Sequence, residues 1–315
     1  MSNSSAPIKK SNKILQAAGI LAALSLALVI TYFYLASVVR PLPRHPVFDH
    51  EGVLVLAHRG GRGLWPENTL YAFRRAAQLG ADVLDMDIHA LKDGTLVVIH
   101  DDTVDRTTDG SGNVQDYTLT GLQKLDAGYR WTVDDGKSYP YRGQGIRVPT
   151  LQEVFMEFPG RRMNIEIKQP QPGTYDNLCR MLGEHDLSHS VVIAAFSTDV
   201  IQAFRRACPG VATAAATGEA LPFYVLSVLS LDKAYHPASE TLQLPGFRNG
   251  QLLLTGNFLQ AAHAHNMEVY AWTIDDVAEM QTLIQAGVNG IITDYPDRLL
   301  KVLGRSVESG VKSEE

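Results

Sequence analysis

The sequence predicts a (β/α)8 barrel, and two observations support this fold class. Short apolar runs recur eight times between residues 53 and 294, and helical patterns separate most of them. Near-continuous apolar runs are typical of parallel strands that are buried on both faces. Their alternation with helices over about 250 residues favours a closed barrel. An open doubly wound sheet is the alternative, but no G-x-G-x-x-G loop follows the first run.

Each predicted element has a sequence signal. The predicted strands are the apolar runs 53–57, 82–88, 96–100, 163–168, 191–196, 211–215, 268–273 and 290–294. The predicted helices are 69–79, 151–157, 174–185, 198–207, 219–231, 256–265, 275–286 and 296–303. Asn68 is the expected N-cap of the first helix, because its side-chain oxygen can accept a backbone N–H bond. Gly80 and Gly287 stand at expected helix C-caps.

Two segments interrupt this alternation. Residues 103–149 have no strong helical pattern and are rich in Gly, Asp, Thr and Tyr. The segment is too long for an ordinary connection, so we expect a functional insertion. Residues 220–250 contain the apolar run 221–231 and a second short run, 242–245, which allows an extra strand. We expect the first run to be a core helix; the alternative is a membrane-facing surface.

Composition and charge exclude several classes of protein. The chain has 315 residues, of which 45% are hydrophobic and 20% charged, and this excludes a disordered chain or a disulfide scaffold. Residues 1–44 carry five cations and no acid, whereas the remainder carries 23 cations and 34 acids, a net charge of −11. Affinity for nucleic acid comes from clustered cations, so we expect no nucleic-acid partner.

Residues 14–39 predict a transmembrane anchor. They form an uncharged stretch of 26 residues, mostly Leu, Ala, Ile and Val, which exceeds the roughly 20 residues that a spanning helix needs. A cleaved signal peptide is the alternative, but its apolar region would be shorter and would end in a small-x-small site. Three lysines precede the stretch and two arginines follow it. This bias favours a cytoplasmic N-terminus and a catalytic domain on the exported side, periplasmic or extracellular.

The domain plan follows from these signals. We expect a short basic tail (1–13), the anchor (14–39), a linker (40–50), a barrel (51–304) with its insertion at about 103–149, and a polar tail (305–315). Three prolines among residues 40–46 predict that the linker is a stiff, extended stalk.

Cys179 and Cys208 are the only cysteines in the chain. In an exported domain these two thiols could pair as a disulfide. Cys179 falls in the predicted helix 174–185, and Cys208 directly follows the predicted helix 198–207. We expect them to be two small, buried, apolar residues.

Polar side chains end several of the predicted strands. In a parallel barrel the carboxyl ends of the strands carry the active site. The residues at those ends are His58, Arg59, Asp85, Asp87, His100, Asp101, Glu166, Lys168, Trp272, Thr273 and Asp294. A barrel interior tolerates few carboxylates unless something cationic pairs with them, so we expect cations at the same place.

Three of these carboxylates form a possible metal site. Asp85 and Asp87 are two residues apart and therefore face the same side of a strand. Glu166 comes from another strand, and three hard oxygen ligands suit Mg²⁺ or Ca²⁺. No histidine pair has a zinc-type spacing. The alternative is that Asp85 and Asp87 are salt-bridged structural carboxylates.

Two histidines complete the predicted site. Asp93-Gly94 is a turn pair, and with it at the centre of a hairpin Asp87 would lie opposite His100. His58 and His100 would then flank the carboxylates, an arrangement that suits general acid–base chemistry near neutral pH. Arg59 and Lys168 add cations that could bind an anion such as a phosphodiester.

The order of motifs along the chain resembles one known family. The matching segments are 58–61 (His-Arg-Gly-Gly), 66–69 (Pro-Glu-Asn-Thr), 72–73, 80–88, 92–94, 97–101, 105–110, 166–168, 272–273 and 287–296. Together they resemble the glycerophosphodiester phosphodiesterases, from about residue 53 to residue 303. The resemblance implies a TIM-like barrel that hydrolyses glycerophosphodiesters to glycerol phosphate and an alcohol.

The same resemblance implies roles for individual residues. His58 and His100 match the acid/base pair; Asp85, Asp87 and Glu166 match the divalent-metal ligands; Arg59 and Lys168 match the phosphate contacts; Trp272 resembles a wall of the substrate site; Glu67 matches a motif position for which we expect an orienting contact. Segment 103–149 resembles the inserted cap of the family. One departure is Asp85, because many members have Glu there, and the shorter side chain affects the choice between Mg²⁺ and Ca²⁺.

Several alternatives stay open. The nucleophile is either water or a hydroxyl of the substrate, and either histidine can act first as the base. A soluble diester such as glycerophosphocholine is the expected substrate; a lysophospholipid, captured with help from the anchor and residues 220–231, is the alternative. A second enzymatic alternative is a phosphoinositide-type phospholipase or a sphingomyelinase-D-like enzyme, because such enzymes share the barrel and the use of two histidines. A non-enzymatic alternative is a membrane-tethered module that binds cations or phosphate.

Overall fold

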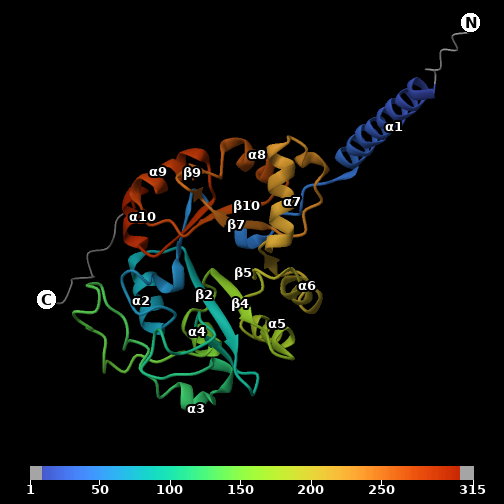
Figure 1. The fold of residues 1–315 in the computed structure, drawn as a ribbon. Coiled ribbons are helices and arrows are strands. Elements are labelled where there is room, and N and C mark those ends of the chain that lie inside the picture. Colours follow the sequence, from blue (N-terminus) through green and yellow to red (C-terminus); the bar gives the residue numbers. More distant parts are fainter. Residues whose placement is uncertain (1–8, 306–315) are drawn as a thin grey trace, which may run out of the picture.

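A computed structural model describes residues 9–305, and it confirms the predicted barrel (Figure 1). Eight parallel strands follow one another around the ring in the order β6-β5-β4-β2-β1-β11-β10-β7. They are β1 (Leu54–Ala57), β2 (Val83–Ala90), β4 (Met163–Gln169), β5 (Val191–Ala194), β6 (Ala212–Thr213), β7 (Thr241–Pro245), β10 (Glu268–Trp272) and β11 (Gly290–Thr293). A bridge between Ala214 and Thr241 joins β6 to β7.

Helices surround the strands and supply the outer half of the core. They are α2 (Leu70–Leu79), α4 (Leu151–Glu157), α5 (Thr174–Glu184), α6 (Thr198–Ala207), α7 (Thr217–Val228), α8 (Gly256–Ala264), α9 (Val277–Ala286) and α10 (Pro296–Val302). Phe73, Phe155, Phe204 and Phe223 are fully buried on these helices. Every residue of β1 is buried, which is why the strand reads as an uninterrupted apolar run.

One predicted barrel strand was wrong. The run 96–100 forms β3 (Leu96–Val98), which pairs antiparallel with β2 outside the ring. Its register places Val98 opposite Ile88, one residue away from the register that Asp93-Gly94 suggested. Only five residues join β2 to β3, and a parallel crossover needs about a dozen. The eighth place in the ring belongs to β7, within the segment where an extra strand was allowed.

The predicted helix caps are confirmed in part. Gly80 and Gly287 adopt the left-handed conformation at the ends of α2 and α9, with φ of 99° and 102°. The N-cap of α2 is Thr69 rather than Asn68, because the Thr69 hydroxyl accepts the bond from Ala72 N. Asn68 itself has a φ of 56°, and its side chain contacts Asp87 instead.

The insertion 103–149 has a small core of its own. It contains a 3-10 turn, η3 (Val114–Asp116), a one-turn helix, α3 (Leu119–Leu122), and several other turns. Its apolar side chains pack with those around β3 in a cluster of Leu91, Val97, Ile99, Val104, Val114, Leu122, Ala127, Ile146 and Val148. The insertion is therefore a folded cap beside the barrel, in which few residues belong to helices or strands.

The N-terminal helix α1 (Lys9–Val38) projects away from the barrel (Figure 1). Its segment Ile14–Val38 is long and apolar enough to cross a membrane, and none of it is buried; a signal sequence has the same properties. The linker after it is attached to the barrel, because Leu42 N donates to His265 O and Asn266 Nδ2 donates to Leu42 O. The turn η1 (Pro46–Phe48) then buries Val47 and Phe48 at the amino end of the strands.

The two cysteines form a disulfide, so the expectation of two unpaired buried residues was wrong. Cys179 lies on α5 and Cys208 follows the last turn of α6, with their Cα atoms 5.4 Å apart. The two helices pack side by side, and this places the sulfur atoms in contact. Helical periodicity alone does not say which residues of neighbouring helices face each other.

The apolar run 221–231 was also assigned to the wrong environment. It forms most of α7, but only one face of that helix is buried, around Ala220 and Phe223. Leu221, Val225 and Val228 are exposed on the other face. The run looked like a core helix because it has no polar stripe, and the structure shows that its outer face is apolar as well.

Candidate active site

A cavity of about 600 Å³ lies at the carboxyl ends of the strands. It brings together eight of the nine predicted site residues, and these are His58, Arg59, Asp85, Asp87, His100, Glu166, Lys168 and Trp272. The ninth, Glu67, lies behind the cavity wall and contacts Arg59. The residues predicted from the sequence therefore lie in or beside one cavity, although they come from different strands and connections.

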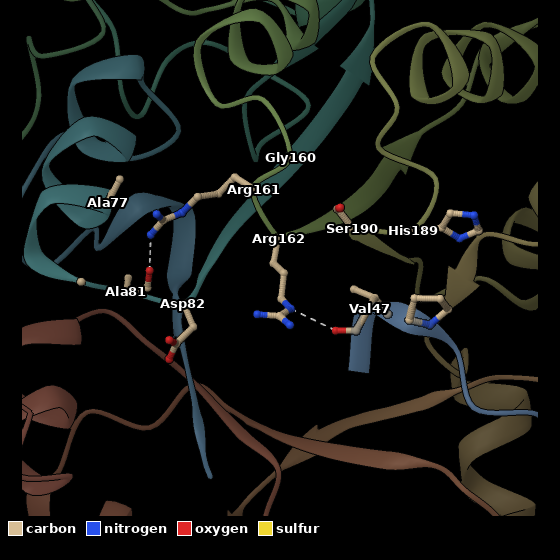
Figure 2. Close-up of a pocket in the computed structure, with 11 residues that line it drawn as sticks. Val47, Ala77, Ala81, Asp82, Gly160, Arg161, Arg162, His189 and Ser190 are labelled. Carbon is tan, nitrogen blue, oxygen red and sulfur yellow. Dashed lines mark hydrogen bonds between the residues drawn. The ribbon is translucent and has the colours of Figure 1, made fainter. Parts of the chain in front are cut away.

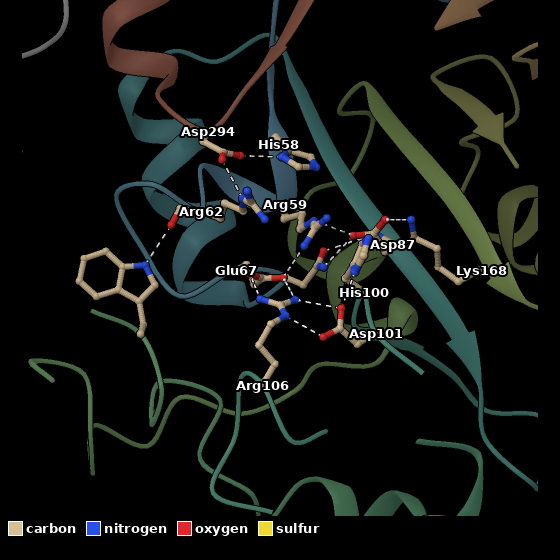
Figure 3. A network of polar contacts seen from close by, with 12 residues as sticks. His58, Arg59, Arg62, Glu67, Asp87, His100, Asp101, Arg106, Lys168 and Asp294 are labelled. Atoms are coloured by element: carbon tan, nitrogen blue, oxygen red, sulfur yellow. Dashed lines mark hydrogen bonds and ion pairs between the residues drawn. The ribbon is translucent and has the colours of Figure 1, made fainter. Parts of the chain in front are cut away.

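His58 is held by a carboxylate from the opposite end of the chain. Its Nδ1 donates to Asp294 Oδ1 at 2.6 Å, and Arg62 Nε donates to the other oxygen at 2.7 Å (Figure 3). Burial acts to raise the pKa of Asp294, but the bonds from His58 and Arg62 outweigh it and hold that pKa below its usual value. An ionised Asp294 keeps the proton on Nδ1, which leaves Nε2 of His58 for proton transfer.

His100 has the same kind of support from its neighbour in sequence. Its Nδ1 lies 2.5 Å from Asp101 Oδ1, and Arg106 Nε donates to Asp101 Oδ2 at 2.6 Å (Figure 3). Burial opposes ionisation of Asp101, yet Arg106 and His100 hold its pKa well below the usual range. Burial lowers the pKa of His100. Each imidazole is therefore oriented by a carboxylate that an arginine keeps ionised.

Glu67 connects the cap to the barrel. Arg59 Nη1 donates to Glu67 at 2.8 Å, and Arg106 of the cap donates to both Glu67 oxygens at 2.7 and 2.8 Å. Although burial acts against it, these two arginines lower the pKa of Glu67 to about 2. Glu67 therefore orients Arg59, which is buried and whose Nε lies 3.3 Å from Asp87 Oδ2. An orienting contact of this kind is what we expected for Glu67.

The paired strands β2 and β4 bring the three predicted metal ligands to one wall of the cavity. Asp87 lies beside Glu166, and Asp85 lies beside Asn164, whose Nδ2 donates to Asp85 Oδ1 at 2.6 Å. Burial raises the pKa of Asp85 to about 6, and repulsion from Asp87 acts in the same direction, while His58 opposes it. Such a cluster of like charges is unfavourable without a cation.

Lys168 is the cation that the structure places among these carboxylates. Its Nζ lies 2.8 Å from Glu166 Oε1 and 3.1 Å from Asp87 Oδ1. Among residues 9–305, no three His, Cys, Asp or Glu side chains are grouped closely enough to hold a metal ion as they stand. The donor chemistry of Asp85, Asp87 and Glu166 nevertheless fits a hard divalent ion, since all three offer carboxylate oxygens.

Sequence reasoning missed several residues of this network. Asp294 and Asp101 were noted at strand ends, but no role was assigned to them; their positions next to predicted site residues were the available signal. Asn68 was read as a helix cap, whereas its Nδ2 donates to Asp87 Oδ2 at 3.0 Å. Arg106 lies in the matching segment 105–110, but no role was predicted for it, because its partners Glu67 and Asp101 meet it only when the cap folds over the barrel.

A second cavity, of about 530 Å³, lies at the amino end of the barrel (Figure 2). It contains Arg161, Arg162 and His189, but both arginines are bound to backbone carbonyls: Arg161 donates to Ala81 O and Arg162 donates to Val47 O at 3.1 Å. The Arg162 contact holds the end of the linker against the amino end of the barrel. The amino face of such barrels serves stability, and the predicted site residues lie at the other end.

Comparison with known proteins identifies the family. Residues 58–298 match the glycerophosphoryl diester phosphodiesterase family. A glycerophosphodiester phosphodiesterase of Caldanaerobacter subterraneus subsp. tengcongensis is 36% identical, over 79% of this chain and 97% of its own length. Human lysophospholipase D GDPD1 is 24% identical, over 78% of this chain and 84% of its own length. This chain belongs to the glycerophosphoryl diester phosphodiesterase family and is a phosphodiesterase.

A solved structure supports the fold. The glycerophosphoryl diester phosphodiesterase domain of Rv2277c from Mycobacterium tuberculosis has a TM-score of 0.72 and 19% identity. The match covers 81% of this chain and all of that domain. At this identity the likeness concerns the barrel alone.

Replacing the carboxylate behind His58 tests its positioning role. In the variant Asp294→Asn the amide no longer favours the Nδ1 proton, so we expect kcat to fall by about 10²–10⁴-fold with little change in KM. Steady-state hydrolysis of a glycerophosphodiester by the full chain measures this. Asp186→Asn, an exposed position after α5, is the matched control and should keep full activity. A near-normal kcat for Asp294→Asn would contradict the role.

Proposed function

We propose that the protein hydrolyses glycerophosphodiesters to glycerol phosphate and an alcohol in a metal-dependent reaction, with His58 and His100 as the general acid/base pair. One observation carries this proposal. Two imidazoles, each backed by an ionised carboxylate, line a single cavity that also contains a buried cation, Arg59, and a partly buried one, Lys168. Few sites other than those for proton transfer at an anionic substrate require both features.

The phosphodiester would bind between Arg59 and Lys168. A phosphodiester carries one negative charge, and its pentavalent transition state carries more. Both cations are preorganised, since Glu67 and Asp87 hold Arg59 while Asp87 and Glu166 hold Lys168. Cations fixed in advance stabilise the additional charge without reorganising during the reaction.

The two histidines would divide the proton transfers. One takes the proton from the nucleophile, and the other protonates the departing oxygen of the alcohol. This division holds whether the nucleophile is water or a hydroxyl of the substrate's own glycerol. His58 follows β1, and His100 follows β3, which pairs with β2 next to β1. Both side chains line the same cavity, so each could act on a different oxygen of one phosphate.

Asp85, Asp87 and Glu166 would hold a divalent ion, Mg²⁺ or Ca²⁺. When bound, such an ion supplies positive charge that stabilises the phosphoryl oxygens in the transition state. Asn164 orients Asp85, because its Nδ2 donates to Asp85 Oδ1. Lys168 already balances the charge of Asp87 and Glu166, so the ion would share these two carboxylates with it.

A lysophospholipid is the second candidate substrate, and the opposite wall of the cavity favours it. That wall is apolar and contains Phe196, Leu221, Tyr224, Leu244 and Trp272. Phe196 and Trp272 meet edge to face, with ring centroids 6.0 Å apart. A glycerophosphodiester without an acyl chain leaves this wall unused. The human relative is named for lysophospholipase D activity, which agrees with this second candidate.

Alanine at either histidine tests the catalytic scheme. For His58→Ala and for His100→Ala we expect a loss of about 10²–10⁴-fold in kcat, because one proton transfer loses its side chain. The full chain in detergent is assayed on glycerophosphocholine and lysophosphatidylcholine side by side, and circular dichroism checks the fold. Glycerol phosphate release from glycerophosphocholine supports the first substrate class, and cleavage of lysophosphatidylcholine alone supports the second. Normal rates in either variant would refute the two-histidine scheme.

Metal titration tests the proposed ligands separately from the histidines. We expect EDTA to abolish hydrolysis by the full chain, and Mg²⁺ or Ca²⁺ to restore it. In Asp87→Asn and Glu166→Gln the metal concentration at half-maximal activity should rise about tenfold or more, because a charged ligand is lost. Asp186→Asn again serves as the control. Activity that survives EDTA, or unchanged titration curves in both variants, would contradict the assignment.

We also propose that α1 remains as a single-pass anchor and that the barrel lies on the exported side. The apolar segment Ile14–Val38 and the lysines before it support the anchor and its orientation. The disulfide between Cys179 and Cys208 supports the compartment, since such bonds persist in oxidising surroundings.

Thiol labelling in cells tests the location. We expect a maleimide-polymer reagent to label Cys179 and Cys208 only after reduction, because an exported domain keeps the disulfide. The reagent adds to denatured protein from cells lysed in acid, and labelling is measured as a shift on a gel. Labelling of both thiols without reduction would place the barrel in a reducing compartment and contradict the proposal.

A further inference from the structure

The outer face of α7 is an exposed apolar surface next to the cavity. Leu221, Val225, Val228 and Leu229 lie at positions i, i+4, i+7 and i+8, which share one side of a helix. Their exposed fractions are 59, 47, 66 and 60%. No charged residue occurs from Ala220 to Leu231. We call these four side chains the α7 face.

Such a face is unusual for the outside of a barrel. In the described part of the chain after α1, the other large apolar side chains that are exposed are Val133, Met156, Phe196 and Val277. They come from separate elements, whereas the α7 face is contiguous. Contiguous apolar surface normally marks a place where another apolar surface docks.

The anchor shows which surface is close enough to dock there. Helix α1 contacts the turn η4 (Asp232–Ala234), which begins three residues after Leu229. Figure 1 shows α1 leaving the barrel on the side of α7. The membrane that would hold α1 is therefore adjacent to the end of the α7 face.

The linker is too short to move the barrel away from a membrane. The apolar segment ends at Val38, and Leu42 is already bonded to His265 and Asn266. Four residue steps span at most about 14 Å when fully extended. The surface around η4 and α8 therefore stays within that distance of the end of the membrane helix.

We propose that the α7 face docks on the bilayer that holds α1, so that the mouth of the cavity faces the lipid headgroups. Leu221 belongs both to the α7 face and to the cavity wall, and Tyr224 on the same helix also lines the cavity. An apolar path therefore runs from the bilayer surface to the reacting groups. Docking rests on the proposal that α1 stays in the membrane, but not on the proposed catalytic activity. The consequence that lipid substrates enter along this path rests on both.

Depth-dependent quenching tests the docking directly. The two natural cysteines are paired, so a single new cysteine can carry a fluorophore. The full chain with Val225→Cys, labelled with an environment-sensitive dye, is placed in phosphatidylcholine vesicles that contain lipids brominated on the acyl chain. The control is Val133→Cys, an exposed valine on the cap, at 68% exposure compared with 47% for Val225. We expect several-fold stronger quenching and bluer emission at position 225 than at position 133.

The outcomes separate the bilayer from a second copy of the chain. Equal quenching at positions 225 and 133 would overturn the proposal. Blue-shifted emission at 225 that bromolipids do not quench, and that disappears when the protein is diluted in lipid, would show that a second copy covers the face, and would also overturn it.

An activity measurement tests the consequence for substrate. In the double variant Val225→Glu with Leu229→Glu, we expect at least a tenfold loss of turnover on lysophosphatidylcholine in vesicles and unchanged turnover of soluble glycerophosphocholine. Strong quenching together with unchanged lipid turnover would leave the docking intact and remove the lipid path. If the parent chain turns over neither substrate, the proposed function fails, while the quenching result still decides the docking.

Discussion

The buried carboxylates at the carboxyl end of the barrel are the constraint on which the rest of the site depends. Each buried charge needs a partner, because removing the partner of a buried ion costs about 3–5 kcal/mol. Asp87 is at the centre, in contact with Arg59, Lys168 and Asn68. The parallel register of β2 and β4 makes this arrangement possible, since it sets Asp87 beside Glu166 with Lys168 within reach of both.

The same constraint explains why a cap without much regular structure matters to the barrel. Arg106 brings its charge to Glu67 and Asp101, and those carboxylates in turn hold Arg59 and His100. A continuous chain of charge-assisted bonds therefore runs from the cap to the groups proposed for catalysis (Figure 3). Such bonds are shorter and stronger than neutral ones, so they fix orientation as well as balance charge. Disturbing the cap should change the site without unfolding the barrel.

The cavity has two chemically different walls, and each wall suits a different part of one substrate. The polar wall, from β2 and β4, matches a phosphodiester, while the apolar wall continues onto the outer face of α7. The short linker between α1 and the barrel keeps that face near the end of α1. A soluble diester needs only the first wall. The apolar wall would contact the acyl chain of a lipid substrate if the enzyme works at a membrane surface.

The sequence by itself determined the barrel, the family and eight of the residues that line the cavity. The reason is that the spacing of apolar residues, the positions of strand ends and the order of motifs can all be read along the chain. The tertiary structure alone decided the pairs that join distant segments. These include Asp294 with His58, Arg106 with Glu67, and Cys179 with Cys208. It also decided that one side of α7 faces outward and that β7, not β3, closes the ring. An apolar run indicates that a segment is buried, but only tertiary packing determines which neighbouring segment buries it.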